Sequence, residues 1–151
     1  MDKQYQDNIT SLEIRVNAVR SKLDYLLNAD NGIDSKAGVL IAVEMAVVTF
    51  SLQNIHCVCG LCFVPITLFC LSICLLWQTL QTKGYNTGVV NFYDNPSYQL
   101  MSSEALLAQL LSDYQKAYDD NYKNIENKSR NYKWALNLFF AGLILLLIFL
   151  F

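Results

Sequence analysis

The chain contains 151 residues, 54% of them hydrophobic, and its formal net charge at pH 7 is −2. This length allows one compact unit. Apolar runs at residues 37–52, 57–79 and 134–151 argue against a soluble domain, because the last two lack charged side chains over a length that crosses about 30 Å of hydrocarbon as a helix. A helix satisfies its own backbone polar groups in lipid. We therefore predict an all-α integral membrane protein with three transmembrane helices and cytoplasmic amphipathic helices, assembled as an oligomeric bundle.

Residues 1–36 are predicted to form a cytoplasmic amphipathic helix. Its apolar positions recur at alternating steps of four and three residues, which is the spacing of a heptad seam. A parallel homodimer would bring Arg15 near Arg20 of its partner, so packing against the second cytoplasmic helix, or in a larger bundle, is favoured. The turn-forming residues at 28–32 predict the end of the helix. The seam residues expected to mediate oligomerisation are Ile9, Leu12, Val16, Val19, Leu23 and Leu26.

Residues 37–80 are predicted to form a two-span transmembrane hairpin, and residues 134–151 a third span. Glu44 lies inside the first span, where an ionisable side chain is costly and usually faces a bundle interior or water. Asn137 is a polar residue of the third span. Both are candidates for gating or pore lining. The alternatives are a Glu44 that is protonated or only locally paired, and a simple helix–helix hydrogen bond from Asn137.

All five cysteines lie within residues 57–74, in or at the outer end of the second span. The spacing of Cys57, Cys59 and Cys62 after His56 matches no known zinc module, and the chain has no second Cys/His pair. No metal site is therefore expected. We interpret the cysteines as small, weakly polar residues at a helix interface, and a disulfide at the outer end stays open if that side is oxidising.

The basic residues lie on one side of the predicted membrane. All 11 Lys and Arg fall in residues 1–36 or 78–133, and none falls in the turn at 53–57 or after Lys133. The positive-inside rule then predicts a cytoplasmic N-terminus and an external C-terminus. Trp77 and Trp134 would lie at the cytoplasmic boundary, where interfacial aromatic residues are common. No cleavable signal peptide is expected, because a polar segment precedes the first apolar run.

Residues 81–133 are predicted to form a cytoplasmic loop followed by a long helix. Within the loop, residues 88–96 are expected to be extended and to end in a turn. Ser102 or Ser103 is expected to cap the helix, with an acidic residue in its first turn. No proline interrupts residues 104–151, which predicts one continuous helix about 70 Å long.

Tyrosines recur along the long helix at helical spacing. Such a stripe is more often core packing, although it could also stack a nucleotide base. Basic residues near the membrane end of the helix would set the topology and contact lipid head groups, or bind phosphate. The candidate ligand contacts are Phe92, Tyr93, Tyr114, Tyr118, Lys123 and Arg130.

The sequence does not favour an enzyme. His56 is the single histidine, and the chain has no glycine-rich phosphate loop and no G-x-S-x-G motif. The carboxylates of the polar segments form no convincing acid–base pair. We therefore expect no catalytic residue and no cofactor, and no DNA or RNA polymer as a partner.

The residues at the entrance to the first span resemble a known motif. Asp34-Ser35-Lys36-Ala37 resembles the D-x-K-A motif of bacterial anti-phage membrane effectors, namely the Pycsar transmembrane effector family and, more distantly, the SLATT-type effectors. The order of elements is also similar, and Phe92-Tyr93 stands where the Pycsar-type family tends to carry an aromatic pair. Glu44 and the cysteine-rich second span are the departures from the family pattern.

The resemblance implies a function and a location. Such effectors are activated by a nucleotide second messenger from a neighbouring cyclase, such as a cyclic pyrimidine mononucleotide. They oligomerise and impair the bacterial inner membrane, which stops growth before phage release. No cyclic-nucleotide-binding barrel fits between the spans, so oligomerised helices or a partner protein would have to sense the signal.

The residues expected to control gating are Asp34, Lys36, Glu44 and Asn137. Membrane lipid is an expected partner in addition to the nucleotide and further copies of the chain. Asp34 is expected to pair with a basic residue of the long helix, Arg130 or Lys133, while Lys36 extends to the head groups. Two alternative functions stay open: a non-catalytic anchor or scaffold for a cytoplasmic partner, and a small-ion or metabolite carrier. A carrier would need polar residues in its spans that face the bundle interior, and this sequence offers few.

Overall fold

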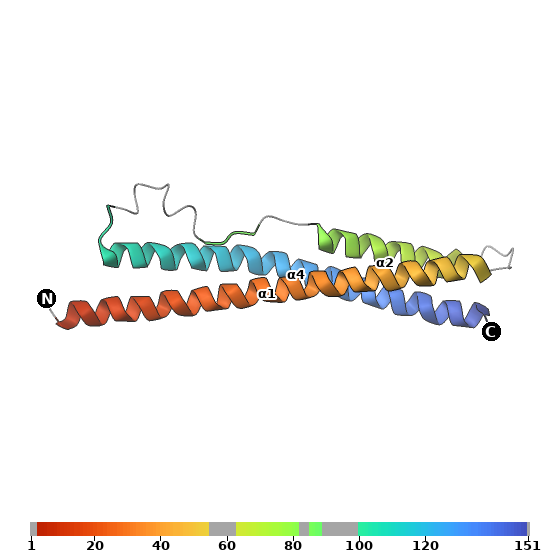
Figure 1. Cartoon of the computed structure of the whole chain (residues 1–151), viewed down its shortest axis with the longest axis horizontal. Helices are drawn as coiled ribbons and strands as arrows, with labels where there is room; N and C mark the ends of the chain where they lie inside the picture. Colours follow the sequence, from red (N-terminus) through yellow and green to blue (C-terminus); the bar gives the residue numbers. More distant parts are fainter. Residues whose placement is uncertain (1–2, 55–62, 82–84, 89–99, 151) are drawn as a thin grey trace. The chain divides into compact units, whose positions relative to one another are not determined.

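The computed structural model describes residues 3–54, 63–81, 85–88 and 100–150. These residues form three helices: α1 (Lys3–Asn54), α2 (Val64–Leu80) and α4 (Ser103–Leu150) (Figure 1). The prediction of an all-α chain with three main helices is confirmed for the described residues. Cys57, Cys59 and Cys62, like most of the expected extended segment 88–96, lie outside them.

Helix α1 corrects one expectation, because it does not end at residues 28–32. It continues from Lys3 to Asn54 without a break, and Gly32 is part of the helix. Asn, Asp and Gly each cost a helix only up to about 1 kcal/mol relative to Ala. Apolar side chains are buried on both sides of this stretch, Leu26 before it and Ala37 after it. Tertiary packing of this kind outweighs a weak local preference for a turn.

Helix α4 begins as the sequence predicts. The Ser102 hydroxyl accepts a hydrogen bond from the Ala105 amide at 3.3 Å, and the Ser102 carbonyl accepts one from Leu106 at 2.9 Å. Glu104 lies in the first turn, where a negative charge suits the helix dipole. The helix then runs for 48 residues, which corresponds to about 72 Å.

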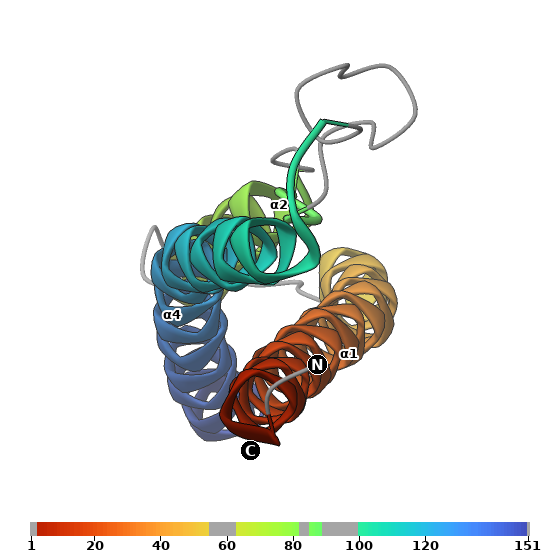
Figure 2. The ribbon, with the colours of Figure 1, turned by 90° about the vertical axis from the view of Figure 1, so that its left-hand side faces the viewer.

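The chain divides into two compact units, and both long helices contribute to both. Unit 1 comprises Met1–Asp30 and Lys83–Ile125, and unit 2 comprises Asn31–Thr82 and Glu126–Phe151. In unit 1 the N-terminal part of α1 lies beside the N-terminal part of α4 (Figures 1 and 2). Each unit has its own buried residues, so each is described separately.

Unit 1 buries the heptad seam of α1 inside the monomer. Val16, Leu23 and Leu26 are at most 8% exposed, while Ile9, Leu12 and Val19 are half-buried. Helix α4 contributes Ala117, Asn121 and Ile125 to the interior of the same unit. The seam therefore packs within the chain. This agrees with the expectation from the like charges, which disfavour a parallel dimer. An intermolecular role of the seam stays a prediction.

A buried asparagine attaches a short non-helical segment to α4 in unit 1. Asn121, which has no exposed surface, donates a hydrogen bond to the Asn86 carbonyl at 2.7 Å and accepts one from the Asn86 amide at 3.2 Å. The Asn86 side chain in turn accepts a bond from the Gly88 amide at 3.0 Å. Gly88 has a φ of +78°, and a methyl group there would come within 2.6 Å of the Tyr114 ring. Glycine is therefore required at this position.

In unit 2, α2 packs against the C-terminal parts of both α1 and α4. Its buried hydrophobic residues are Ala37, Leu40, Phe69, Leu76, Ala135, Phe139 and Leu146. The Phe69 and Phe139 rings are 5.9 Å apart and tilted, a favourable aromatic geometry. A methyl group built on Gly142 would come within 3.0 Å of the Phe69 ring, so this glycine allows α2 and α4 to approach closely.

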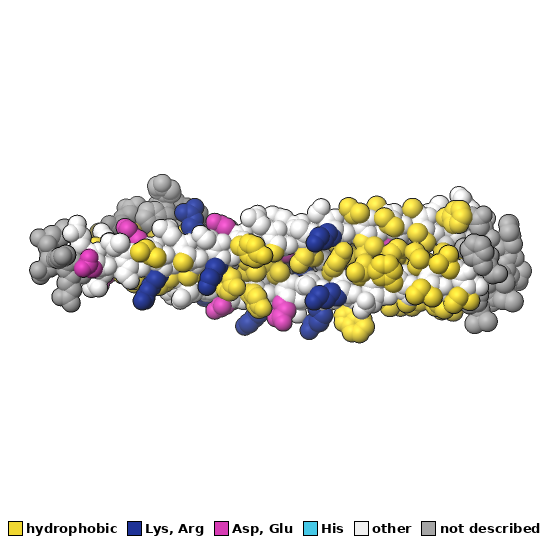
Figure 3. Space-filling model, turned by 90° about the horizontal axis from the view of Figure 1, so that it is seen from below, with side chains coloured by type: hydrophobic (Ala, Val, Ile, Leu, Met, Phe, Trp, Pro, Cys, Tyr) yellow, Lys and Arg dark blue, Asp and Glu magenta, His cyan; other side chains and the backbone are white. Residues whose placement is uncertain are grey.

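Much of the surface of unit 2 is apolar, while several polar side chains are inside it. Glu44, Ser51, Ser72 and Thr79 have no exposed surface. Large hydrophobic side chains such as Val39, Phe50, Leu71, Phe140 and Ile148 are more than half exposed, and hydrophobic atoms cover much of this unit in Figure 3. Extended apolar surface of this kind is unusual for a soluble monomer.

Two of the described helices, α1 and α4, are long and apolar enough to cross a membrane. The third, α2, has 17 residues and is shorter than the usual span of about 20. Pro65 stands in its first turn, where the missing amide costs no helical hydrogen bond. At the other end the Gln81 amide donates a hydrogen bond to the Trp77 carbonyl at 3.1 Å.

Candidate functional site

The candidate site in unit 2 consists of two polar contacts in an otherwise apolar bundle. The first is an ion pair at the end of the unit where α1 enters it. Lys128 of α4 donates hydrogen bonds to both carboxylate oxygens of Asp34, each at 3.1 Å. The Lys128 side chain is 6% exposed and that of Asp34 is 28% exposed. Because the ammonium group is almost fully shielded from water, this pair differs from an ordinary surface salt bridge.

This pair corrects the expected partner of Asp34. The sequence predicted a partner on the long helix, either Arg130 or Lys133. Arg130 is exposed and donates instead to Asn127 at 3.0 Å, and Lys133 is exposed. On a helix, Lys128 projects about 160° away from Arg130 at 100° per residue, which is why only one of the two can face α1. Sequence proximity to the membrane end did not indicate which face of α4 meets α1.

The second contact joins all three helices through oxygen atoms. Ser72 of α2 lies between Glu44 of α1 and the backbone of α4. The Ser72 hydroxyl is 2.6 Å from Glu44 Oε1 and 2.8 Å from the Ala135 carbonyl oxygen. Glu44 Oε2 has no hydrogen-bond partner among the described residues. Glu44 therefore faces the interior of the bundle, and the sequence did not identify Ser72 as its partner.

The remaining gating candidates lie elsewhere on unit 2. Lys36 is exposed and borders a shallow depression of about 290 Å³, which Val39 and Tyr132 also line. Asn137 is exposed on α4 and does not face the Glu44 contact. The structure thus places Asp34 and Glu44 in defined interhelical contacts, and places Lys36 and Asn137 on the surface.

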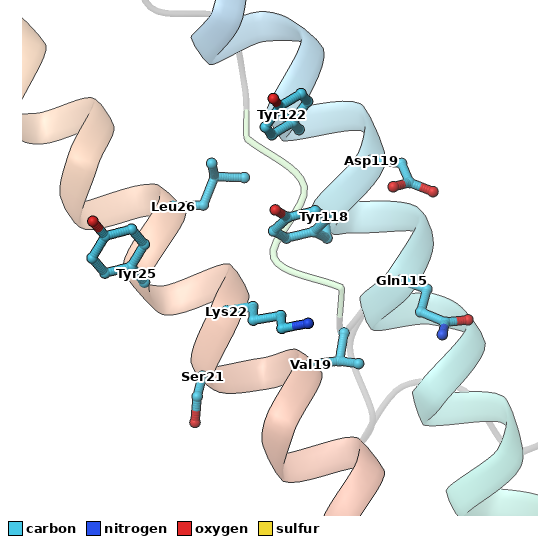
Figure 4. Close-up of a pocket in the computed structure, with 9 residues that line it drawn as sticks. All are labelled: Val19, Ser21, Lys22, Tyr25, Leu26, Gln115, Tyr118, Asp119 and Tyr122. Carbon is cyan, nitrogen blue, oxygen red and sulfur yellow. The ribbon is translucent and has the colours of Figure 1, made fainter.

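Unit 1 contains a groove between α1 and α4 with a volume of about 720 Å³. Lys22 and Leu26 of α1 and Tyr118 and Tyr122 of α4 point into the space between the helices (Figure 4). The Tyr118 and Tyr122 rings are stacked, with centroids 6.0 Å apart and an angle of 25° between their planes. Asp119 and Gln115 complete the α4 side. Tyrosine rings beside a lysine can hold a planar ring that carries an anionic group.

Of the expected ligand contacts that the structure describes, the groove includes one. Tyr118 lines it, whereas Tyr114 packs against Gly88, and Lys123 and Arg130 are exposed elsewhere on α4. Phe92 and Tyr93 lie outside the described residues. Lys22 and Tyr25 of α1 were not recognised, because the register between two helices cannot be derived from either helix alone.

The described part of the chain contains no group of three or more His, Cys, Asp or Glu side chains that could hold a metal ion. Cys70 and Cys74 of α2 are exposed free thiols. The comparisons with protein-family models, curated proteins and solved structures found no match to this chain.

Proposed function

We propose that this chain is a membrane effector of a bacterial anti-phage system, which a nucleotide signal activates and which then oligomerises and permeabilises the inner membrane. The observation that carries the proposal is the distribution of polarity in unit 2. Many large apolar side chains of this unit are exposed, and its polar side chains Glu44 and Ser72 are buried between helices. The apolar outer surface of such a unit suits contact with lipid, and its buried polar groups could line a pathway when the bundle opens.

The proposed topology is a cytoplasmic N-terminus and an external C-terminus, with α2 as the second of three transmembrane helices. The segment 37–54 of α1, the whole of α2 and the segment 134–150 of α4 each measure about 25 Å, close to the thickness of the hydrocarbon layer. Trp77 and Trp134 are 64% and 61% exposed, and suit an interfacial position at the cytoplasmic boundary.

The proposed resting state is held by the Asp34–Lys128 pair and by the contact of Glu44 with Ser72. A nucleotide bound in the groove beside Tyr118 and Lys22 would favour a rearranged bundle and shift the population towards it. The resemblance of Asp34-Ser35-Lys36-Ala37 to the Pycsar membrane effectors supports a cyclic pyrimidine mononucleotide as the signal. Homo-oligomerisation is part of the same proposal.

The test uses the full chain reconstituted in vesicles loaded with a self-quenched fluorescent dye. Cyclic CMP and cyclic UMP are added separately, and cyclic AMP serves as the control nucleotide. We expect dye release with one of the pyrimidine nucleotides only, together with a larger species after chemical crosslinking. Tyr118→Ala should remove the response, whereas Lys116→Ala, at an exposed position of α4 outside the groove, should retain it.

Two other outcomes would replace the proposal. If no nucleotide causes leakage and a cytoplasmic protein is retained by the full chain in detergent, the anchor or scaffold function is the better one. If vesicles leak at the same rate without any nucleotide, the chain is a constitutive pathway for small solutes.

A further inference from the structure

The Glu44 contact contains more oxygen atoms than protons if the carboxyl group is ionised. A serine hydroxyl has a single proton and can donate one hydrogen bond at a time. Ser72 Oγ nevertheless lies at hydrogen-bonding distance from two oxygens, at 2.6 Å from Glu44 Oε1 and 2.8 Å from the Ala135 carbonyl. The carbonyl can only accept. One additional proton is therefore needed for both contacts to be hydrogen bonds.

Glu44 is the group that can supply this proton. With a proton on Oε1, Glu44 donates to the Ser72 hydroxyl, and the hydroxyl donates to the Ala135 carbonyl. Oε2 is then the carbonyl oxygen of a neutral acid, which explains how it is buried without a hydrogen-bond partner among the described residues. An ionised carboxylate would leave a charged oxygen buried and unbonded, which is far more costly.

Among the described residues, no countercharge faces Glu44 from the helices packed around it. Within the described spans, α2 carries Cys70 and Cys74 as its titratable groups, and both are exposed. On α4, Lys133 lies two residues before Ala135 and is exposed, and Tyr132 lies about one turn before Ala135. On α1, Lys36 lies eight residues before Glu44 and is exposed, whereas Asp34 lies ten residues before it, about 15 Å along the helix, and is paired with Lys128.

A metal cation does not fit the same oxygens. The oxygens lie at O–H···O distances, 2.6 and 2.8 Å, with a hydroxyl directly between the other two. A hard cation such as Ca²⁺ takes six to eight oxygen ligands and would have to separate them. The ligand that suits this arrangement is a proton.

We propose that Glu44, Ser72 and the Ala135 carbonyl form a proton-binding site within the membrane, and that release of the proton loosens the packing of α1 against α2 and α4. The site itself stands on the contacts above. Its coupling to membrane opening rests on the proposed function. An ionised Glu44 would be stabilised only where water reaches it, and water would reach it when the bundle opens.

The site is tested with dicyclohexylcarbodiimide, an apolar reagent that reacts with protonated carboxyl groups in membranes. The acid adds across the carbodiimide, its proton to nitrogen and its oxygen to carbon, and the adduct rearranges to a stable N-acylurea with no leaving group. Membranes containing the full chain are treated at neutral pH, and peptides are identified by mass spectrometry. We expect an adduct on Glu44 and none above background on the exposed carboxylates Glu13 and Asp119.

Two further arms decide what the adduct means. A water-soluble carbodiimide with an added amine should give the opposite pattern, modifying Glu13 and Asp119 and sparing Glu44. Raising the pH should reduce the Glu44 adduct, because the ionised carboxylate does not react. Absence of the Glu44 adduct while its peptide is detected, or modification of Glu44 by the water-soluble reagent, overturns the proton site.

The coupling to opening has its own readout. Glu44→Gln keeps the size and the hydrogen-bond donor of the protonated acid but cannot ionise. It should keep the helix packing, judged by crosslinking of cysteines introduced on α1 and α2, and should lose nucleotide-dependent dye release. Normal release by Glu44→Gln overturns the coupling. If wild-type protein forms the adduct and no nucleotide causes release, the proposed function fails and the proton site stands.

Discussion

Lys128 and Asp34 are 94 residues apart in the sequence, and the lysine Nζ donates to both oxygens of the aspartate at 3.1 Å. This contact fixes α4 against α1 at the end of unit 2 where the apolar segment of α1 begins. Because the lysine is 6% exposed, its charge depends on nearby acceptors.

The first prediction concerns this ion pair. Lys128→Gln and Asp34→Asn should each destabilise the protein by about 1–3 kcal/mol, which lies between the values for an exposed pair and for a fully buried pair because Asp34 is partly exposed. The exchange Asp34→Lys with Lys128→Asp should recover part of the loss. Lys36→Gln, two residues from Asp34 and exposed, is the matched control and should be neutral. Thermal unfolding in detergent measures all four, and equal melting temperatures for Lys36→Gln and Lys128→Gln would contradict the prediction.

The second prediction concerns the contact between α2 and α4. Gly142→Leu should separate the two helices, because even a methyl group at this position comes within 3.0 Å of the Phe69 ring. Overpacking typically costs about 1–3 kcal/mol. The control is Ala141→Leu, which places the same side chain on the exposed neighbouring position. Disulfide crosslinking between cysteines placed on α2 and α4 should fall for the first variant only.

The third prediction concerns the attachment of residues 85–88 to α4. Asn121→Ala removes both hydrogen bonds to the Asn86 backbone and leaves a partly buried amide and carbonyl without these partners, at a cost of up to about 1–3 kcal/mol each. The Asn86 amide should then exchange with deuterium much faster. Asn127→Ala, on the exposed surface of the same helix, should leave exchange at Asn86 unchanged. Unchanged protection in Asn121→Ala would show that other contacts hold the segment.

The fourth prediction separates intramolecular from intermolecular packing of the seam. Leu23 is 2% exposed, so Leu23→Asp should open unit 1 and increase proteolysis within α1 and α4. Ile14→Asp, at a position that is 64% exposed, tests the outer surface of the same helix. A variant that stays resistant to protease but loses crosslinked oligomers identifies the intermolecular surface. We expect Ile14→Asp to stay folded and Leu23→Asp not to.

The fifth prediction is the membrane topology. In a background with all five cysteines replaced, a cysteine at Asn54 should react with a membrane-impermeant maleimide in intact cells. A cysteine at Tyr98 should react only after the membrane is permeabilised. The prediction rests on the one-sided distribution of the 11 basic residues, and labelling of position 98 alone in intact cells would reverse the topology.

Local signals predicted the elements of this chain well. The apolar runs predicted α1, α2 and α4, and the Ser102 cap with the uninterrupted sequence after it predicted the start and continuity of α4. The same kind of signal failed at residues 28–32, where α1 continues. A turn preference of about 1 kcal/mol per residue cannot end a helix that is buried on both sides of it.

The sequence alone predicted that Glu44 would face a protein interior or water, because an ionisable group in an apolar run is costly when it faces lipid. It also predicted a basic partner for Asp34 on the long helix. Only the tertiary structure decided that Ser72 and the Ala135 carbonyl meet Glu44, and that Lys128 rather than Arg130 meets Asp34. The physical reason is that hydrophobic periodicity indicates which face of a helix is buried, whereas pairing depends on the axial register and rotation between helices. Side chains from all three helices set these together.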